Sequence, residues 1–437
     1  MTLDRNINHS FSGINTIREK AIELNNHIDN HECCGLDRLG KLIVYLFFVY
    51  LTSEDRNKEE NENRIDISKG LDNKDLTELA FRARLIEKDN GMEDYEIFSF
   101  ISSLRDKLFF NIKEELSGGS EESSNSFFSS FGYDIEVDEI YDLMAFIWRR
   151  YISRHYTDEE LRLSQSILSI ADGDYILLES NTLPGLFMSI GKEKECDVVF
   201  SIDNVYERTL SKMLFIMTVP KDKWNRYRFI KEITGEESLR NNNRDGLEYP
   251  NKVVSFSSLD AGIRVIRDQN SNLGNKFFSI KDLIERGAKT LFFVSSGLLS
   301  FGKGGANKLR KEVFNIDSSL SVLSFDRRYQ NIIFIDGTKK HEEEVLMLNL
   351  DEVDIVFDDV TCSEIAASIT GNEEKAGDLK DRAMQIKRDT IEKDDYMLYP
   401  PYFIEKKVGE IRGLSEIDAK LDEKYRDLSA LCRRMRG

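Results

Sequence analysis

The sequence lacks the residues that build a disulfide framework or a zinc site. Its five cysteines among 437 residues are odd in number and scattered, which indicates reduced thiols. Cys33 and Cys34 are adjacent and lie near His31, but no second pair of cysteine or histidine residues has the spacing of a zinc ligand set. We therefore predict neither disulfides nor a metal.

Long apolar runs are missing as well. The longest, Leu42–Leu51, is much shorter than the roughly 20 residues that a membrane-spanning helix needs. The first residues, MTLDRNINHS, contain no basic stretch followed by an apolar one, as a secretory signal would. The sequence predicts a cytoplasmic protein with no membrane partner.

Positive charge is in deficit. The chain has 79 acidic and 61 basic residues and a net charge of −18. A protein that holds duplex DNA by neutralising phosphates usually carries a basic excess or a basic stripe. Two interpretations follow: either DNA is not the ligand, or a partner subunit supplies most of the contact with DNA.

Several catalytic signatures do not occur. The glycines at Gly302, Gly304 and Gly305 do not have the spacing of a P-loop, and the chain has no Gly-x-Ser-x-Gly nucleophile elbow. The five histidines form no recognisable triad or ligand pair. The sequence therefore indicates neither P-loop nucleotide hydrolysis nor serine-hydrolase chemistry.

The length indicates two or three domains, and we assign the first to residues 1–116. Apolar residues recur there at spacings of three and four, which is the helical period. The predicted helices cover Ile14–Ile28, Leu36–Leu51, Leu76–Ile86 and Tyr95–Phe110. This region is therefore predicted to be a helical bundle.

A serine-rich stretch, SGGSEESSNSFFSS, lies in residues 117–133 and predicts a flexible linker. Residues 134–370 follow, and their pattern predicts an α/β domain, because apolar runs of strand length alternate with amphipathic helices. The expected helices are residues 135–151, 205–217 and 306–314. The expected strands are Asp174–Glu179, Asp197–Ile202, Lys252–Phe256, Thr290–Val294, Leu320–Phe325, Asn331–Asp336 and Glu344–Leu350.

The segment from Ala288 to Asp351 is more specific. An apolar strand leads into a glycine-rich turn, the next helix carries Arg310, and a later strand ends in Phe-Ile-Asp at residues 334–336. In these features the segment resembles the C-terminal half of the catalytic domain of type I restriction-modification modification subunits, which are N-6 adenine DNA methyltransferases. The resemblance implies a Rossmann-like methyltransferase domain, preceded by an N-terminal α-helical bundle and followed by a C-terminal helix.

The same resemblance implies S-adenosylmethionine as the cofactor. Thr157 stands where the family opens the cofactor site, although Thr157 or Asp158 is also a good N-cap for the helix that follows. Glu179 ends the first strand, and Gly185 lies in the turn after it. Gly185 is the one glycine that remains of the family's glycine-rich turn. Asp203 follows the second strand, where the family places an acid that holds the ribose hydroxyls. An acid after a buried strand is equally typical of the N-cap of the next helix, so both roles stay open for Asp203.

The catalytic motif of the resembled family is Asn/Asp-Pro-Pro-Tyr/Phe at the end of the fourth strand, where it holds a flipped adenine. This chain has Ser255, Phe256, Ser257 and Ser258 at that position. The tetrapeptide therefore has neither the amide nor the prolines. We predict that the chain has no catalytic residues for methyl transfer.

Prolines are scarce, and the only adjacent pair among the five is Pro400–Pro401. Tyr399 precedes this pair where the catalytic motif needs Asn or Asp, so we interpret the segment as structural. It belongs to a C-terminal region, residues 371–437. We expect a charged helix at about residues 372–393 and a final amphipathic helix with apolar residues at helical spacing from Leu414 to Met435.

The final helix is predicted either to pack on its own domain or to dock on another chain, such as a specificity-type subunit. The first functional hypothesis is a degenerate, non-catalytic methyltransferase-like protein, a scaffold in a DNA-modification or phage-defence assembly that meets DNA through the complex. The second is an active S-adenosylmethionine-dependent adenine DNA methyltransferase subunit. The third is an interaction module unrelated to DNA.

Overall fold

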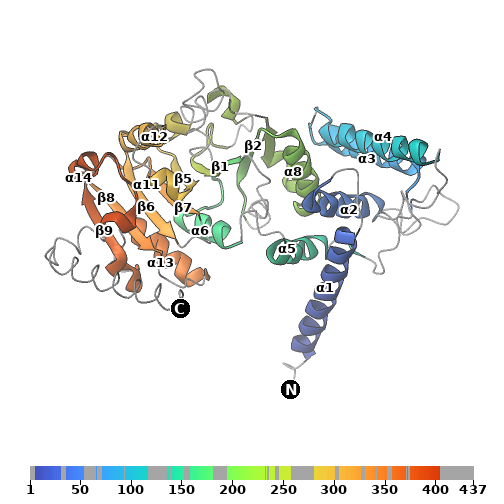
Figure 1. Ribbon diagram of the computed structural model, residues 1–437, viewed down its shortest axis with the longest axis horizontal. Helices are drawn as coiled ribbons and strands as arrows, with labels where there is room; N and C mark the ends of the chain where they lie inside the picture. Colours follow the sequence, from blue (N-terminus) through green and yellow to red (C-terminus); the bar gives the residue numbers. More distant parts are fainter. Residues whose placement is uncertain are drawn as a thin grey trace, which may run out of the picture. The chain divides into compact units, whose positions relative to one another are not determined.

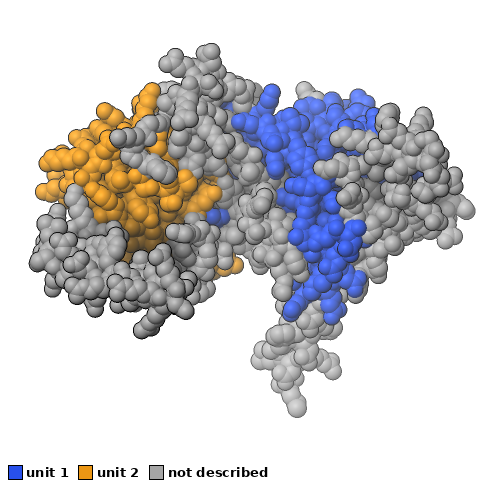
Figure 2. All heavy atoms as spheres, in the orientation of Figure 1, with its two compact units in different colours: residues 1–161, 170–252 blue, residues 162–169, 253–437 orange. Residues whose placement is uncertain are grey.

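The computed structural model of the chain divides into two compact units. Unit 1 comprises residues 1–161 and 170–252, and unit 2 comprises residues 162–169 and 253–437 (Figure 2). The structure describes residues 5–30, 36–53, 65, 71–92, 94–116, 135–136, 139–151, 158–180, 194–231, 233, 236–241, 246–256, 280–300, 305–325, 330–340, 342–351, 357–370, 372 and 375–403.

Unit 1 begins with helices. They are α1 (Arg5–Asn30), α2 (Arg38–Thr52), α3 (Asn73–Asp89), α4 (Glu96–Leu116) and α5 (Ile140–Tyr151). Asp37 begins α2 by accepting a hydrogen bond from the Gly40 backbone N–H at 2.8 Å. Asp72 and Asp75 form a capping box at the start of α3. α2 is apolar on every face and almost entirely buried, as expected of a helix surrounded by protein.

The strands of unit 1 are parallel. β1 (Tyr175–Ser180) pairs with β2 (Asp197–Ile202), and β2 pairs with β3 (Tyr227–Ile230). Every residue of β2 is buried, which is typical of a parallel strand covered on both faces. Among the residues that the structure describes, unit 1 also contains α8 (Val205–Thr218) and the 3-10 turns η4 (Lys221–Arg226) and η5 (Glu236–Leu239).

Helix α8 is buried continuously from Arg208 to Met217. It packs against β2 and against α2, α4 and α5 of the same unit (Figure 1). Its serine and threonine hydroxyl groups are satisfied by the helix itself, since for example Thr209 donates to the Val205 carbonyl at 2.8 Å and Ser211 to the Glu207 carbonyl at 2.7 Å. α8 therefore joins the helices of unit 1 to its strands.

Unit 2 carries the antiparallel part of the sheet. β5 (Lys289–Val294) and β6 (Ser319–Phe325) both pair antiparallel with β7 (Asn331–Asp336), which lies between them. β8 (Glu344–Leu350) pairs parallel with β6 and antiparallel with β9 (Ala383–Lys387). The described helical elements of unit 2 are residues 280–285, α11 (Ser296–Ser300), α12 (Gly305–Phe314), α13 (Asp359–Thr370), η6 (Gly377–Arg382) and α14 (Arg388–Lys393).

The strands belong to one sheet with the order β3-β2-β1-β4-β5-β7-β6-β8-β9. β4 (Lys252–Phe256) and α6 (Asp158–Leu168) each have residues in both units. The order from β3 to β6, with antiparallel β7 between β5 and β6, is that of a Rossmann-like methyltransferase sheet, and β8 and β9 extend it. The predicted fold class, N-terminal helices before a Rossmann-like α/β domain, is confirmed.

Some details differ from expectation. The helix predicted from Ile135 begins at Ile140. The edge strands β3 and β9 were not indicated by the sequence, and β9 lies within residues 372–393, which we wrongly expected to be helical throughout. Both strands are only partly buried, so neither carries the continuous buried run that marks the central strands. The expected linker, residues 117–133, and the final helix, within residues 404–437, lie outside the described residues.

Candidate cofactor site

Two of the predicted cofactor residues lie at one edge of the unit 1 strands. Glu179, near the end of β1, is in register with Ser201 of β2 and is fully buried. Asp203 directly follows β2 and is half-buried. Because β1 and β2 are parallel, both acids lie at the carboxyl edge, where open α/β sheets bind ligands. The other two, Thr157 and Gly185, lie outside the described residues.

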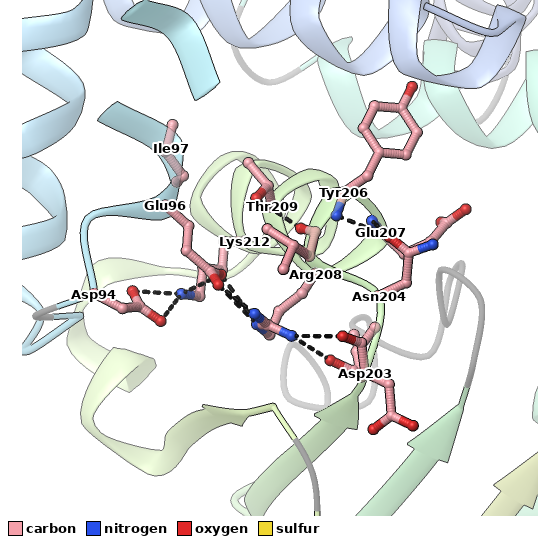
Figure 3. Close-up of polar contacts among 12 residues, drawn as sticks. Asp94, Glu96, Ile97, Asp203, Asn204, Tyr206, Glu207, Arg208, Thr209 and Lys212 are labelled. Carbon is pink, nitrogen blue, oxygen red and sulfur yellow. Dashed lines mark hydrogen bonds and ion pairs between the residues drawn. The ribbon is translucent and has the colours of Figure 1, made fainter. Parts of the chain in front are cut away.

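The structure distinguishes the two roles that the sequence left open for Asp203. The N-cap of α8 is Asn204, whose Oδ1 accepts hydrogen bonds from the backbone N–H groups of Tyr206 and Glu207 at 2.9 and 3.3 Å. The N-cap interpretation of Asp203 is therefore wrong. Figure 3 shows the Asp203 carboxylate pointing away from α8.

Arg208 of α8 holds the backbone at the end of β2. Its Nη1 donates to the carbonyl oxygens of Ile202 at 2.6 Å and Asp203 at 3.2 Å. Ile202 is the last residue of β2, so side-chain donors take over where the strand pairing ends. The Nε and Nη2 atoms of Arg208 donate to the Glu96 carboxylate, with Nε 3.1 and 3.0 Å from its two oxygens. The guanidinium is thus bonded on two sides.

Glu96, at the start of α4, is part of a cluster that we call the α8 ion-pair network: Asp94, Glu96, Arg208 and Lys212 (Figure 3). Lys212 Nζ donates to both Asp94 oxygens at 2.6 Å and to Glu96 Oε2 at 2.9 Å. The side chain of Lys212 is 1% exposed and that of Glu96 13%, whereas that of Asp94 is 48% exposed. Buried charges need such partners, so the network fixes α4 against α8.

A further acid fixes the start of α4. Glu87, near the end of α3, is fully buried and accepts hydrogen bonds from the backbone N–H groups of Ile97 at 2.8 Å and Phe98 at 3.0 Å. These donors belong to the first turn of α4, where a helix leaves them unpaired. Burial raises the pKa of Glu87 to about 6, against the opposing effect of these hydrogen bonds and of Lys212.

The start of α8 is also tied to α2. The Tyr206 hydroxyl donates to Asp37 Oδ1 at 2.9 Å, the same oxygen that accepts from the Gly40 backbone N–H. Burial raises the pKa of the Tyr206 hydroxyl, and the hydrogen bond to Asp37 acts in the same direction. A Cβ atom on Gly40 would overlap the Tyr206 hydroxyl oxygen, so this contact requires glycine.

The position of the catalytic tetrapeptide lies at the end of β4 in unit 2. Ser255 and Phe256 are the last two residues of the strand and are fully buried. The Phe256 ring stacks on Phe293 of β5, with ring centroids 4.7 Å apart. Phe256 thus occupies the core of the unit. Ser257 and Ser258 lie outside the described residues.

The segment around the proline pair is packed into unit 2. The Tyr399 hydroxyl donates to Asp351 Oδ2 at 3.1 Å. Leu398 is fully buried, and its backbone N–H donates to the Leu299 carbonyl at 3.2 Å. These contacts hold the segment against the rest of unit 2.

Arg310, one of the residues behind the family resemblance, is buried in the same region. Its Nε donates to the Tyr396 carbonyl at 2.8 Å and its Nη1 to the Leu298 carbonyl at 2.5 Å. Asn307 donates to the Asp395 carbonyl at 2.8 Å. Asp395 and Tyr396 both have φ of 58°, in the left-handed region that residues other than glycine seldom adopt. Helix α12 therefore holds this turn in place.

Sequence reasoning did not find the α8 ion-pair network. Glu96 and Arg208 are 112 positions apart, so no spacing connects them. A signal was present in the helix itself, where Arg208 and Lys212 stand four residues apart among mostly apolar residues. Cations on a buried helix need carboxylate partners, which could have been sought in the N-terminal helices.

Within the described part of the chain, no three His, Cys, Asp or Glu side chains are grouped so that they could hold a metal ion. Its cysteines, Cys196 and Cys362, are buried free thiols. None of the described helices has the length and apolar character needed to cross a membrane.

No protein-family model matches the chain, and neither does any curated protein. Among solved structures, it is similar to the type IIG restriction endonuclease BpuSI, at 12% identity and a TM-score of 0.44 over 87% of this chain. The chain spans 46% of that endonuclease. It is also similar to the type I restriction enzyme EcoKI M protein, at 13% identity and a TM-score of 0.38 over 93% of this chain and 96% of that one. A Listeria monocytogenes protein assigned to the class I S-adenosylmethionine-dependent methyltransferases has 13% identity and a TM-score of 0.37, over 80% of this chain and 98% of that one.

Proposed function

We propose that the chain is a degenerate N-6 adenine DNA methyltransferase-like subunit that does not transfer methyl groups and acts as a scaffold in a DNA-modification or phage-defence assembly. The observation that carries the proposal is the end of β4. An adenine methyltransferase of the resembled family needs an amide and two prolines there. Here Ser255 and Phe256 are buried in the strand, and Phe256 stacks on Phe293.

The residues at the carboxyl edge of β1 and β2 support a site that binds a ligand but does not transfer a methyl group. Asp203 is half-buried, is not the N-cap residue of α8 and lies where an acid can accept hydrogen bonds from ribose hydroxyls. Glu179 adds a second, buried carboxyl group at the end of the neighbouring strand. The class of ligand that fits this chemistry is a nucleoside-containing cofactor such as S-adenosylmethionine.

The second candidate function is active adenine methyl transfer. The observation that favours it is the same pair of acids, Glu179 and Asp203, because a cofactor edge is the first requirement of a methyltransferase. In this case Ser257, Ser258 or another residue outside the described part would have to hold the flipped adenine.

The proposal about binding partners rests on the net charge of the chain. With a net charge of −18, the chain is a poor match for duplex DNA by itself, so we propose that DNA is met through a complex. The predicted C-terminal helix, within residues 404–437, is the proposed docking segment for a specificity-type subunit. Loss of all association with DNA-modification subunits would instead favour an interaction module unrelated to DNA.

The test combines calorimetric titration with S-adenosylmethionine and transfer of a tritiated methyl group to duplex DNA rich in adenine. The matched variants are Asp203→Ala at the cofactor edge and Asp172→Ala, an exposed acid before β1 at the opposite edge. We expect micromolar binding that Asp203→Ala weakens and Asp172→Ala leaves unchanged, with no methyl transfer. Methyl transfer by the wild-type chain would overturn the proposal in favour of the active enzyme. Lack of binding at millimolar ligand would refute the cofactor site.

A further inference from the structure

The end of β2 is fixed by a residue of α8 that is itself fixed from a different region of the sequence. Arg208 Nη1 bonds to the carbonyl oxygens of Ile202 and Asp203, the two residues at which the strand ends. The other edge of the same guanidinium bonds to the carboxylate of Glu96, which belongs to the N-terminal helices. A planar guanidinium can bond to both sides at once only if it is held in one orientation.

Lys212 holds the other side of Glu96. Its Nζ bonds to Glu96 Oε2 at 2.9 Å and to both oxygens of Asp94 at 2.6 Å. The contacts therefore form a linear series from Asp94 through Lys212, Glu96 and Arg208 to the backbone of Asp203 (Figure 3). Only the last member of this series is at the proposed cofactor edge.

We infer that Glu96 and Arg208 are positioning residues, which set the backbone of Asp203 and thereby the direction of its carboxylate toward a ribose-containing ligand. Next to Asp203, Asn204 caps α8 and holds the Tyr206 and Glu207 amides, so the whole turn from strand to helix is specified. The inference rests on the proposed cofactor role of Asp203. It adds that contacts from the N-terminal helices determine the affinity of the carboxyl edge of β1 and β2 for the ligand.

The alternative is that the α8 ion-pair network only holds helices together. The Arg208→Lys variant distinguishes this structural role from the positioning of the Asp203 backbone. A lysine keeps the charge that faces Glu96 but cannot donate to the carboxylate and to both carbonyls in the geometry of the guanidinium. Glu96→Ala removes the support of Arg208 altogether. Asp94→Asn is the matched control, because Asp94 contacts Lys212 and is about half-exposed, and the structure shows no bond from it to Arg208.

The first measurement needs no ligand. Hydrogen–deuterium exchange of the full chain is followed in peptides that cover residues 202–207 and, as a reference, β1. We expect exchange in residues 202–207 to become at least roughly tenfold faster in Arg208→Lys and Glu96→Ala, while the reference and the Asp94→Asn protein stay unchanged. Unchanged exchange at residues 202–207, or equally faster exchange throughout unit 1, would overturn the inference.

The second measurement is the affinity for S-adenosylmethionine by calorimetry. We expect Arg208→Lys and Glu96→Ala to weaken binding by roughly tenfold or more and Asp94→Asn by less than about twofold. In the Asp203→Asn background, Glu96→Ala should have little further effect, because it acts through Asp203, whereas an independent structural role would give additive losses and refute the inference. If the wild-type chain does not bind the ligand, the cofactor function fails, and the exchange experiment alone decides whether Glu96 positions this turn.

Discussion

Arg208 and Lys212 lie one turn apart on α8 and share the carboxylate of Glu96, yet their replacement by methionine should have unequal effects on stability. In Arg208→Met, the carbonyls of Ile202 and Asp203 lose their side-chain donor, and Glu96, only 13% exposed, keeps Lys212 as its partner. Leaving these carbonyl acceptors without their donor and losing the charged hydrogen bonds to Glu96 should cost about 3–5 kcal/mol in total.

In Lys212→Met, water can replace the lost contact at Asp94, which is 48% exposed, and Glu96 keeps Arg208. The methionine also retains most of the buried lysine stem. The loss is then mainly one charged hydrogen bond and one surface-like ion pair, about 1–2 kcal/mol in total. The two variants should therefore differ by about 2 kcal/mol, although each removes one buried cation.

Urea unfolding followed by tryptophan fluorescence measures this difference. Both tryptophans, Trp148 and Trp224, belong to unit 1, and Trp224 packs against Phe215 of α8 with ring centroids 5.8 Å apart. A difference of about 2 kcal/mol corresponds to a separation of about 1 M between the two urea midpoints. Equal midpoints, or a lower midpoint for Lys212→Met, would refute this argument. It holds that the loss of stability depends on how exposed the group is that loses its bonding partner.

Three further predictions concern other contacts. The pKa of Glu87 is about 6 in the fold against 4.5 unperturbed, so the folded state binds the extra proton between these values and stability falls as pH rises through them, by about 2 kcal/mol. Denaturant unfolding between pH 4 and pH 7 should show that Glu87→Gln removes this fall, and a parallel pH profile in both proteins would contradict it. Gly40→Ala should lower stability by about 1–3 kcal/mol because of overlap with Tyr206, and Tyr206→Phe should recover part of this loss in a thermal melt of the double variant. Arg310→Lys should cost unit 2 about 1–3 kcal/mol, since lysine cannot replace both carbonyl contacts, and protection from proteolysis near Tyr396 should fall with it; an unchanged cleavage rate would contradict this.

The central strands could be predicted from sequence because a strand that is buried on both faces consists of a nearly continuous run of apolar residues. The apolar run of Asp197–Ile202 matches β2 residue for residue, and Lys252–Phe256 matches β4. β9 could not be found in the same way. Its side chains are partly exposed, so the strand reads as part of a charged amphipathic segment between helical turns. Edge strands are thus the part of a sheet that the pattern of apolar residues predicts least well.

The candidate site was predictable only where it depends on position along a strand. Glu179 and Asp203 could be placed at one edge because they end two consecutive strands that are parallel. The cap at Asn204 was missed by one residue, since Asp and Asn are both good N-caps and the sequence does not say which begins the helix. The ion pairs of Glu96 depend on tertiary contacts between distant helices, for which no local pattern exists.

The burial of α8 from Arg208 to Met217 has a consequence for how related sequences can diverge. An element without a solvent face cannot accept a substitution that suits one neighbour alone, so its positions must change together with positions in α4 and β2. An aligned set of relatives should show positions 96 and 208 exchanging as a pair, for instance both charged or both apolar. Position 94, about half-exposed, should vary independently of that pair.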